Sequence, residues 1–387
     1  MKKLNFIIKY GLALLLLSFY SCESWLNVTP SDRLSEEMLF NDREGFVKAL
    51  NGVYIELNTN ELYGRNLTAG ALDVMGQYYS VASSSHAFYN YGGLVYTGND
   101  EKALFDNMWQ KCYAVIACCN TIIEKCDENK AGLSPVWKGS IKGEALALRA
   151  MLHFDMLRLF GPLTSELDKE SIPYQTNSDQ TVTPLLSGSE VIGLILDDLK
   201  NAVGLLKDTD PYFVEEEFSD TDLNYRRFRM NYFAAKGLMA RVQLWGGDKE
   251  KAAATAKEVI AEGQAEGAEF FPFVTNSEAT SSNPDRVFYS EVLFGTYHSS
   301  REKLHEDLFA PTLESTSILT LAGTARRDDL YDNENDYRYS VWSTYNKNGT
   351  SVLYHRKFEK QDNVTASRQY MIPLIRMSEM YLIAVEC

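Results

Sequence analysis

The amino-acid sequence predicts a mainly α fold, built on helix pairs of the tetratricopeptide type and completed by a loop-rich region with a few short strands. Apolar residues recur at helical spacing in successive segments between residues 32 and 263. The last two segments, within residues 231–263, carry alanines where paired helices approach closely, as in helix-turn-helix repeats, although a clean period of ~34 residues is absent. Beyond Gly263 the helical spacing fades.

Residues that cap or terminate helices divide residues 32–263 into separate predicted helices. Ser35 is placed to cap the first helix, and Gly161 and Pro162 terminate the third. Ser189 is placed to cap the fourth, and the turn at residues 246–248 separates the last two. The predicted helices span residues 32–57, 104–125, 137–160, 189–206, 231–245 and 248–263.

Two regions lack helical spacing. Residues 60–100 are rich in Gly, Ser, Asn and Tyr, and so long a stretch without regular structure is usually functional or disordered. In the second region, residues 288–296, 352–358 and 370–375 are predicted to form short strands or extended segments. Ser378 then opens a last helix that reaches Cys387, the end of the sequence.

The first 22 residues predict export and lipidation. Lys2 and Lys3 precede an apolar stretch at residues 7–17, which is too short and too interrupted for a membrane span. Small Ser21 and then Cys22 follow, where a bacterial lipobox ends, although Phe19 replaces the usual aliphatic residue. We therefore predict a signal peptide at residues 1–21 and a mature N-terminus at Cys22, acylated and membrane-anchored.

Composition restricts the classes of partner. The net charge of -15 and the absence of basic patches argue against nucleic acid, because nucleic-acid binding needs clustered Lys and Arg. The 23 Tyr and 19 Phe residues, many outside helical segments, favour binding of uncharged, ring-shaped ligands. Cys112, Cys119 and Cys126 share one helix face roughly 10 Å apart, too far for disulfides, and are predicted to be small buried residues.

Several sequence blocks, taken in order across nearly the whole mature chain, resemble the SusD/RagB family of surface lipoproteins from Bacteroidetes. No single block is specific, but their order and spacing are. The matching blocks are Cys22-Glu-Ser-Trp-Leu26 with Pro30, residues 44–54 ending in Asn-Gly-Val-Tyr, residues 109–123 with Asn120-Thr-Ile-Ile, Gly143-Glu-Ala-Leu-Ala-Leu-Arg149 through Phe160-Gly-Pro162, Ala234-Ala-Lys-Gly-Leu-Met-Ala-Arg241 with Gly247-Asp248, and Ile375-Arg-Met-Ser-Glu-Met-Tyr-Leu382.

The resemblance implies an α-α superhelix of tetratricopeptide-like helix pairs that cradles an irregular region. It implies one SusD-like domain over residues 22–387, with a helical part at about 32–263, a loop-rich part at about 264–376 and a final helix. It further implies a lipid-anchored, surface-exposed outer-membrane protein that binds a nutrient and delivers it to a SusC-like TonB-dependent transporter. The expected ligand is an oligosaccharide, and the protein is expected to have no catalytic activity, cofactor or metal.

Three alternatives stay open. A RagB-like importer subunit would bind peptide, and a tetratricopeptide-type scaffold would bind only protein. A glycoside hydrolase would need paired carboxylates, whose separation the sequence does not reveal, but the common catalytic and nucleotide-binding motifs are absent. Family members also continue past the residue 375–382 block, so the final helix is expected to be cut short, leaving an apolar face uncovered.

Two sets of aromatic residues are candidates for ligand contact, because sugar rings stack on aromatic rings while their hydroxyls need polar partners. The first set lies in the irregular segment where the family usually places its ligand contacts. The second follows an acidic turn and could equally form a half-buried strand through Tyr337, Tyr339 and Val341. In either set the rings could instead be core residues. The candidates are Tyr78, Tyr79, Tyr89, Tyr91, Tyr96, Tyr339, Trp342 and Tyr345.

Other charged motifs are predicted to be structural. Asp332, Glu334 and Asp336 are spaced like the start of a calcium loop, but the required glycine and the terminal glutamate are missing. A solvated acidic turn is the preferred interpretation. Glu144, Arg149 and Arg158, all on one predicted helix, are assigned to ion pairs rather than to a ligand.

Overall fold

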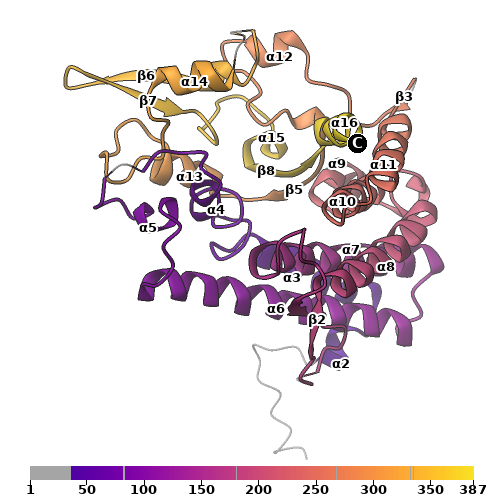
Figure 1. The fold of residues 1–387 in the computed structure, drawn as a ribbon. Helices are drawn as coiled ribbons and strands as arrows, with labels where there is room; N and C mark the ends of the chain where they lie inside the picture. The colour runs from indigo at the N-terminus through magenta and orange to yellow at the C-terminus, as the bar shows by residue number, and fades with distance from the viewer. Residues whose placement is uncertain (1–35, 82, 180, 267, 332, 334) are drawn as a thin grey trace, which may run out of the picture.

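The computed structural model describes residues 36–387 apart from residues 82, 180, 267, 332 and 334, and its larger elements are helices (Figure 1). The predicted mainly α fold with stacked helix pairs is confirmed. The first predicted helix divides at residues 40–42, because Asp42 caps a new helix by accepting a hydrogen bond from the Gly45 amide at 2.9 Å. The main helices are α2 (Glu36–Leu39), α3 (Arg43–Leu57), α6 (Asn99–Glu128), α7 (Pro135–Phe160), α8 (Gly188–Thr209), α10 (Tyr232–Trp245), α11 (Lys249–Gly263) and α16 (Met377–Glu386).

Side-chain caps fix where the helices begin. Ser134 caps α7, with Pro135 at the first helical position, and Asn231 and Asp248 cap α10 and α11. The predicted cap of α8 was wrong by two residues. Ser187, not Ser189, is its cap, because Ser187 and Glu190 form a reciprocal capping box, while the Ser189 hydroxyl donates to the Leu167 carbonyl.

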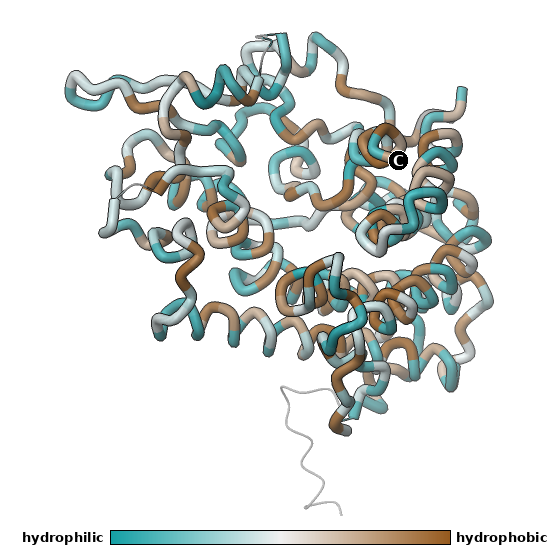
Figure 2. Tube along the Cα trace, viewed as in Figure 1, coloured by the Kyte–Doolittle hydropathy of each residue, from teal (hydrophilic) through white to brown (hydrophobic). Residues whose placement is uncertain are grey.

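Each long helix packs against the next along the chain. α6 packs on α7, α7 on α8, α8 on α10, α10 on α11, and α11 on α16, while α3 crosses α6 and α7. α7 contacts α3, α6, α8 and α10 and is buried nearly all round, so its charged residues Glu144, Arg149 and Asp155 are buried with its apolar ones. Figure 2 shows hydrophobic residues concentrated along these packed helices. Cys112, Cys119 and Cys126 are buried in this core as free thiols, as predicted.

Buried ion pairs join the helices. Arg149 on α7 donates two hydrogen bonds of 2.7 Å to Asp198 on α8, and Arg226 binds Asp210. Burial alone would raise the pKa of Glu144, but Arg229 and Arg226 outweigh it and hold the pKa below its ordinary value. The prediction that Glu144 and Arg149 serve ion pairs is confirmed, although their partners lie on other elements. Arg158 pairs with Asp155 within α7.

The second half of the chain contributes short strands and helices. β5 (Val292–Tyr297) pairs antiparallel with β8 (Met371–Arg376), and β6 (Trp342–Lys347) pairs with β7 (Thr350–His355) in a hairpin. The predicted strands near these positions are confirmed, but the strand through Tyr337, Tyr339 and Val341 was wrong, because residues 339–341 form a 3₁₀ turn. Other short elements are β1 (Glu170–Pro173), β2 (Leu185–Ser187), α9 (Asp220–Asn224), β3 (Gln264–Ala265), β4 (Ala268–Glu269), α12 (Asn276–Thr280), α13 (Arg301–Leu308), α14 (Thr324–Leu330) and α15 (Ala366–Tyr370).

A second hydrophobic cluster joins the two irregular regions. The segment after α3 contains α4 (Ala71–Met75) and α5 (Tyr89–Gly92), so residues 60–100 are more ordered than predicted. Val74, Tyr79 and Tyr91 from this segment pack with Leu304, Phe309 and Leu353 from the second half. The irregular segments therefore form one layer beside the helices (Figure 1).

Candidate ligand-binding pocket

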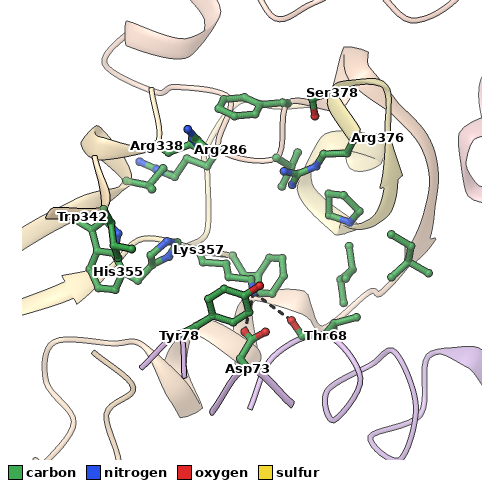
Figure 3. Close-up of a pocket in the computed structure, with 18 of the residues that line it drawn as sticks. Thr68, Asp73, Tyr78, Arg286, Arg338, Trp342, His355, Lys357, Arg376 and Ser378 are labelled. Atoms are coloured by element: carbon green, nitrogen blue, oxygen red, sulfur yellow. Dashed lines mark hydrogen bonds and ion pairs between the residues drawn. The ribbon is translucent and has the colours of Figure 1, made fainter. Parts of the chain in front are cut away.

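A cavity of about 690 Å³ lies where the two irregular regions meet the turn between β8 and α16. Its lining comes from residues 67–79, 286–288, 321–358 and 372–382. Four segments of the sequence thus build one pocket. Figure 3 shows three arginines on one side of it, Tyr78, Asp73 and Thr68 on the other, and Lys357 between them.

Lys357 forms the floor of the pocket by tying the two regions together. Its Nζ donates to the Thr68 carbonyl and to the Asp73 Oδ2, each at 3.1 Å (Figure 3). The ammonium also lies 5.2 Å from the centre of the Phe358 ring, within the range of a cation–π contact. All of its charge is therefore balanced within the protein.

Tyr78 is placed by the end of α4. Gln77 adopts a left-handed conformation, with φ of 61°, and the Tyr78 and Gln77 amides donate to the Asp73 and Val74 carbonyls at 3.0 Å. These two bonds form a Schellman motif, which satisfies the last carbonyls of the helix. The turn directs the chain outward, and the Tyr78 side chain lines the pocket with 66% of its surface exposed.

Trp342 and His355 form an apolar wall with one free donor. The two rings meet edge to face, with 4.5 Å between their centres, and Tyr79 packs 6.4 Å from Trp342. Burial, with a further contribution from Lys357, lowers the pKa of His355 to about 3, so the ring is neutral at physiological pH. The Trp342 Nε1–H is buried and has no partner among the described residues.

The loop at residues 285–289 presents Arg286 and Phe288 to the pocket. The Asp285 carboxylate accepts hydrogen bonds from the amides of residues 287, 288 and 289 at 2.8–3.1 Å, which fixes the loop. On the same side of the pocket, the Arg376 guanidinium lies 5.9 Å from the centre of the Phe288 ring. Arg338 lines the same side and binds Asp336 through two nitrogens.

A family model described as "starch-binding associating with outer membrane" matches residues 24–244, which is more than half of the chain. The chain belongs to the SusD-like family. The predicted resemblance is confirmed, and this SusD-like chain therefore belongs to a family associated with starch binding and the outer membrane. In the part of the chain that the structure describes, no helix has both the length and the apolar character needed to cross a membrane.

Relatives and solved structures support the assignment. The SusD-like protein P2 of Formosa agariphila is 26% identical over 265 residues, 67% of this chain and 46% of that protein. The chain spans less than half the length of the curated relatives it matches. A SusD superfamily protein of Bacteroides thetaiotaomicron has the same fold, with a TM-score of 0.69, 20% identity, and coverage of 89% of this chain and 75% of that one. A laminarin-binding SusD-like protein aligns with a TM-score of 0.62 and 16% identity, over 89% of this chain and 80% of that one.

The structure brings only some of the predicted contact residues of this SusD-like chain together. Tyr78, Tyr79 and Trp342 line the pocket, although only Tyr78 is exposed. Tyr91 is buried, and Tyr96 packs on Phe105 with 5.3 Å between ring centres. The exposed rings of Tyr89 and Tyr345 and the half-buried ring of Tyr339 lie outside the pocket lining.

Most of the charged residues of the pocket were not predicted from the sequence. Asp73, Lys357 and Arg286 lie in irregular segments without a motif, and Arg376 falls in a family block that suggested no ligand role. Only their spatial convergence identifies them. The predicted lipidation site Cys22 and two residues of the predicted acidic turn, Asp332 and Glu334, lie outside the described residues. Within those residues no group of three or more His, Cys, Asp or Glu side chains is placed to hold a metal.

Proposed function

We propose that this SusD-like chain binds an oligosaccharide in the pocket formed by the two irregular regions. The family description and the laminarin-binding structural neighbour support a glycan as the ligand. The pocket supports it further, since its volume of about 690 Å³ is typical of ligand sites.

The observation that carries the proposal is the pairing of an exposed ring with unused donors. Tyr78 offers an aromatic face at the edge of the pocket, on which the apolar face of a sugar ring can stack. The Trp342 Nε1–H and the Arg286 Nη1 are buried without a partner among the described residues, although both side chains line the pocket. Sugar hydroxyls accept hydrogen bonds from such groups, and unpaired buried donors are otherwise costly.

We also propose that the chain delivers its ligand to a SusC-like TonB-dependent transporter, without acting on the ligand chemically. The family's association with the outer membrane supports this step. An acylated Cys22 would hold the protein at the cell surface beside the transporter. The ligand is thus bound, concentrated near the membrane and released.

Calorimetric titration tests the ligand class directly. The protein is titrated with a panel of oligosaccharides and, in parallel, with mixed peptides of similar size. We expect saturable binding of at least one oligosaccharide and no binding of the peptides. Binding of peptides alone would contradict the glycan assignment and support a RagB-like importer subunit. Appearance of new reducing ends during incubation would contradict a purely binding role.

The anchor is tested in cells. Wild-type protein and a Cys22→Ser variant are expressed in a host that processes lipoproteins, and the membrane and soluble fractions are compared. We expect wild-type protein in the outer-membrane fraction, where it co-purifies with a TonB-dependent transporter, and the variant in the soluble fraction. Equal distribution of both proteins would contradict lipid anchoring at Cys22.

A further inference from the structure

The side chains that line the pocket carry a net positive charge, although the whole chain is negatively charged. The chain carries a net charge of -15, yet four cationic and two acidic side chains line the pocket. Both acids already have cationic partners. Asp73 binds Lys357, and Glu379 binds Arg241 through two hydrogen bonds of 2.5 and 2.6 Å. No carboxylate of the lining is left to neutralise the arginines.

Arg376 is the first cation without an anionic partner. Within the described part of the chain, its guanidinium forms no ion pair and no side-chain hydrogen bond, and its one ring contact is with Phe288. Besides Glu379, which binds Arg241, two carboxylates stand nearby, and backbone amides donate to both. Asp285 caps residues 287–289, and Glu291 accepts from the Val274 amide at 3.1 Å. Burial lowers the pKa of Arg376, which indicates a desolvated cation.

Arg286 is only partly neutralised. Its side chain is 6% exposed, and its Nη2 lies 3.2 Å from Glu359 Oε2. The same oxygen accepts a hydrogen bond of 2.7 Å from Arg356, so two guanidinium groups share one carboxylate. The Arg286 Nη1 is buried and, in the described chain, has no partner. A nearly buried guanidinium with an unused face lines the cavity.

We propose that the oligosaccharide carries an anionic group, the carboxylate of a uronic acid or a sulfate ester, which Arg286 and Arg376 bind. This inference rests on the proposed function. Guanidinium groups donate paired hydrogen bonds to such oxygens, and buried cations gain most from an anion when they lack one in the protein. Tyr78 lies across the pocket from the arginines (Figure 3), so one sugar unit can stack on its ring while the anionic group faces the guanidinium groups.

The test compares three hexasaccharides of similar length by calorimetry: a neutral glucan, a polygalacturonate fragment and a sulfated galactan. Each is titrated into wild-type protein, into Arg376→Gln, and into Arg326→Gln. Arg326 is a matched control, because it is exposed on α14 outside the pocket lining. The two anionic arms distinguish carboxylate from sulfate as the recognised group.

We expect at least one anionic hexasaccharide to bind roughly tenfold more tightly than the neutral one. Its affinity should fall with added salt, and Arg376→Gln should remove most of the preference while Arg326→Gln leaves it unchanged. If Arg376→Gln does not fold, Arg376→Lys, which keeps the charge but loses the paired donors, should weaken the preference in part.

The contrary outcomes separate the two proposals. Binding of the neutral hexasaccharide with equal or higher affinity overturns the anionic assignment and leaves the oligosaccharide site intact. An equal loss of neutral and anionic binding in Arg376→Gln also overturns it, because the arginine would then be structural. If the wild-type protein, shown to be folded by circular dichroism, binds none of these hexasaccharides or any other oligosaccharide, the proposed function itself fails.

Discussion

Lys357 and Asp73 lie 284 positions apart in the sequence, yet the Lys357 Nζ is 3.1 Å from the Asp73 Oδ2. The side chains are 27% and 16% exposed, so water screens the pair only partly. The lysine follows β7, and the aspartate belongs to the first turn of α4. With the Lys357–Thr68 hydrogen bond and the second hydrophobic cluster, this contact connects the two irregular regions beside the pocket.

Replacement of Lys357 by Met should therefore destabilise the protein. The variant keeps most of the side-chain volume but leaves a partly buried carboxylate without its cation. We expect the free energy of unfolding to fall by about 1 kcal/mol. Urea denaturation measures the change, with Lys257→Met on the exposed face of α11 as the control. An equal effect of both substitutions would show that the contact contributes no stability.

Breaking the buried ion pair of Arg149 and Asp198 should lower the free energy of unfolding more than breaking the Lys357–Asp73 pair. Their side chains are 8% and 9% exposed, and Tyr174 also donates to the Asp198 carboxylate. Arg149→Met is expected to cost about 3–5 kcal/mol, because it leaves a buried charge unpaired. Arg158→Met on the same helix should cost at most about 1 kcal/mol, because the Arg158 side chain is 39% exposed.

A double-mutant cycle separates this charge effect from lost packing. Asp198→Asn removes the negative charge while keeping an acceptor for Tyr174. We expect the double variant Arg149→Met/Asp198→Asn to be more stable than the sum of the single effects by at least about 1 kcal/mol. Strict additivity in denaturation experiments would refute the coupling.

Gly143 should be required for the close approach of α7 and α8. A Cβ at this position would lie 2.8 Å from the Leu206 Cγ, so Gly143→Ala is expected to destabilise by about 1–3 kcal/mol. The matched variant Gly204→Ala on α8 meets no atom within 4 Å and should stabilise by up to about 1 kcal/mol. Thermal unfolding of both variants gives the comparison, and a stable Gly143→Ala protein would contradict the packing.

His153 should make the protein less stable as the pH falls. Burial lowers its pKa in the folded state to about 3, whereas an unfolded histidine titrates near pH 6.5. Between these values the unfolded chain binds a proton that the folded chain excludes, so stability decreases as pH is lowered. Well between these two pKa values, the free energy of unfolding falls by about 1.4 kcal/mol per pH unit for each such histidine.

Comparison with His153→Gln isolates this contribution. The His153 Nδ1 lies 3.0 Å from the Arg149 carbonyl, and its Nε2 accepts from the Gln175 amide at 3.0 Å, which requires the neutral ring. Urea unfolding at about pH 7 and about pH 5.5 should show a smaller loss in the variant than in the wild type. His355 keeps a similar contribution in both proteins. Equal losses would mean that His153 is protonated in the folded protein.

Helix positions were predictable because their signals are local. The predicted stop at Gly161 acts within one turn of the chain, as do the caps that the structure shows at Ser134, Asn231 and Asp248. The error at Ser189 was also local. Ser187 and Ser189 lie two residues apart at the start of the helix, and only Ser187 has a glutamate, Glu190, three residues later to complete a capping box. Spacing of apolar residues likewise located the buried cysteines.

The site was less predictable because it depends on distant contacts. Tyr78 and Trp342 were found by residue type, but the same criterion selected Tyr91, which is buried in the second hydrophobic cluster. A tyrosine in a glycine-rich segment has the same sequence signature whether it faces solvent or the core. The convergence of Arg286 and Arg376 has no local signature at all, since 90 positions separate them.

The most direct test of the oligosaccharide site compares two exposed tyrosines from the same segment. Tyr78 lines the pocket and Tyr89 does not, although both rings are exposed. Calorimetric titration of Tyr78→Ala and Tyr89→Ala with an oligosaccharide that the wild type binds should show a Kd raised roughly tenfold for the first variant and unchanged for the second. Weakened binding in Tyr89→Ala with unchanged binding in Tyr78→Ala would contradict the assignment of this pocket.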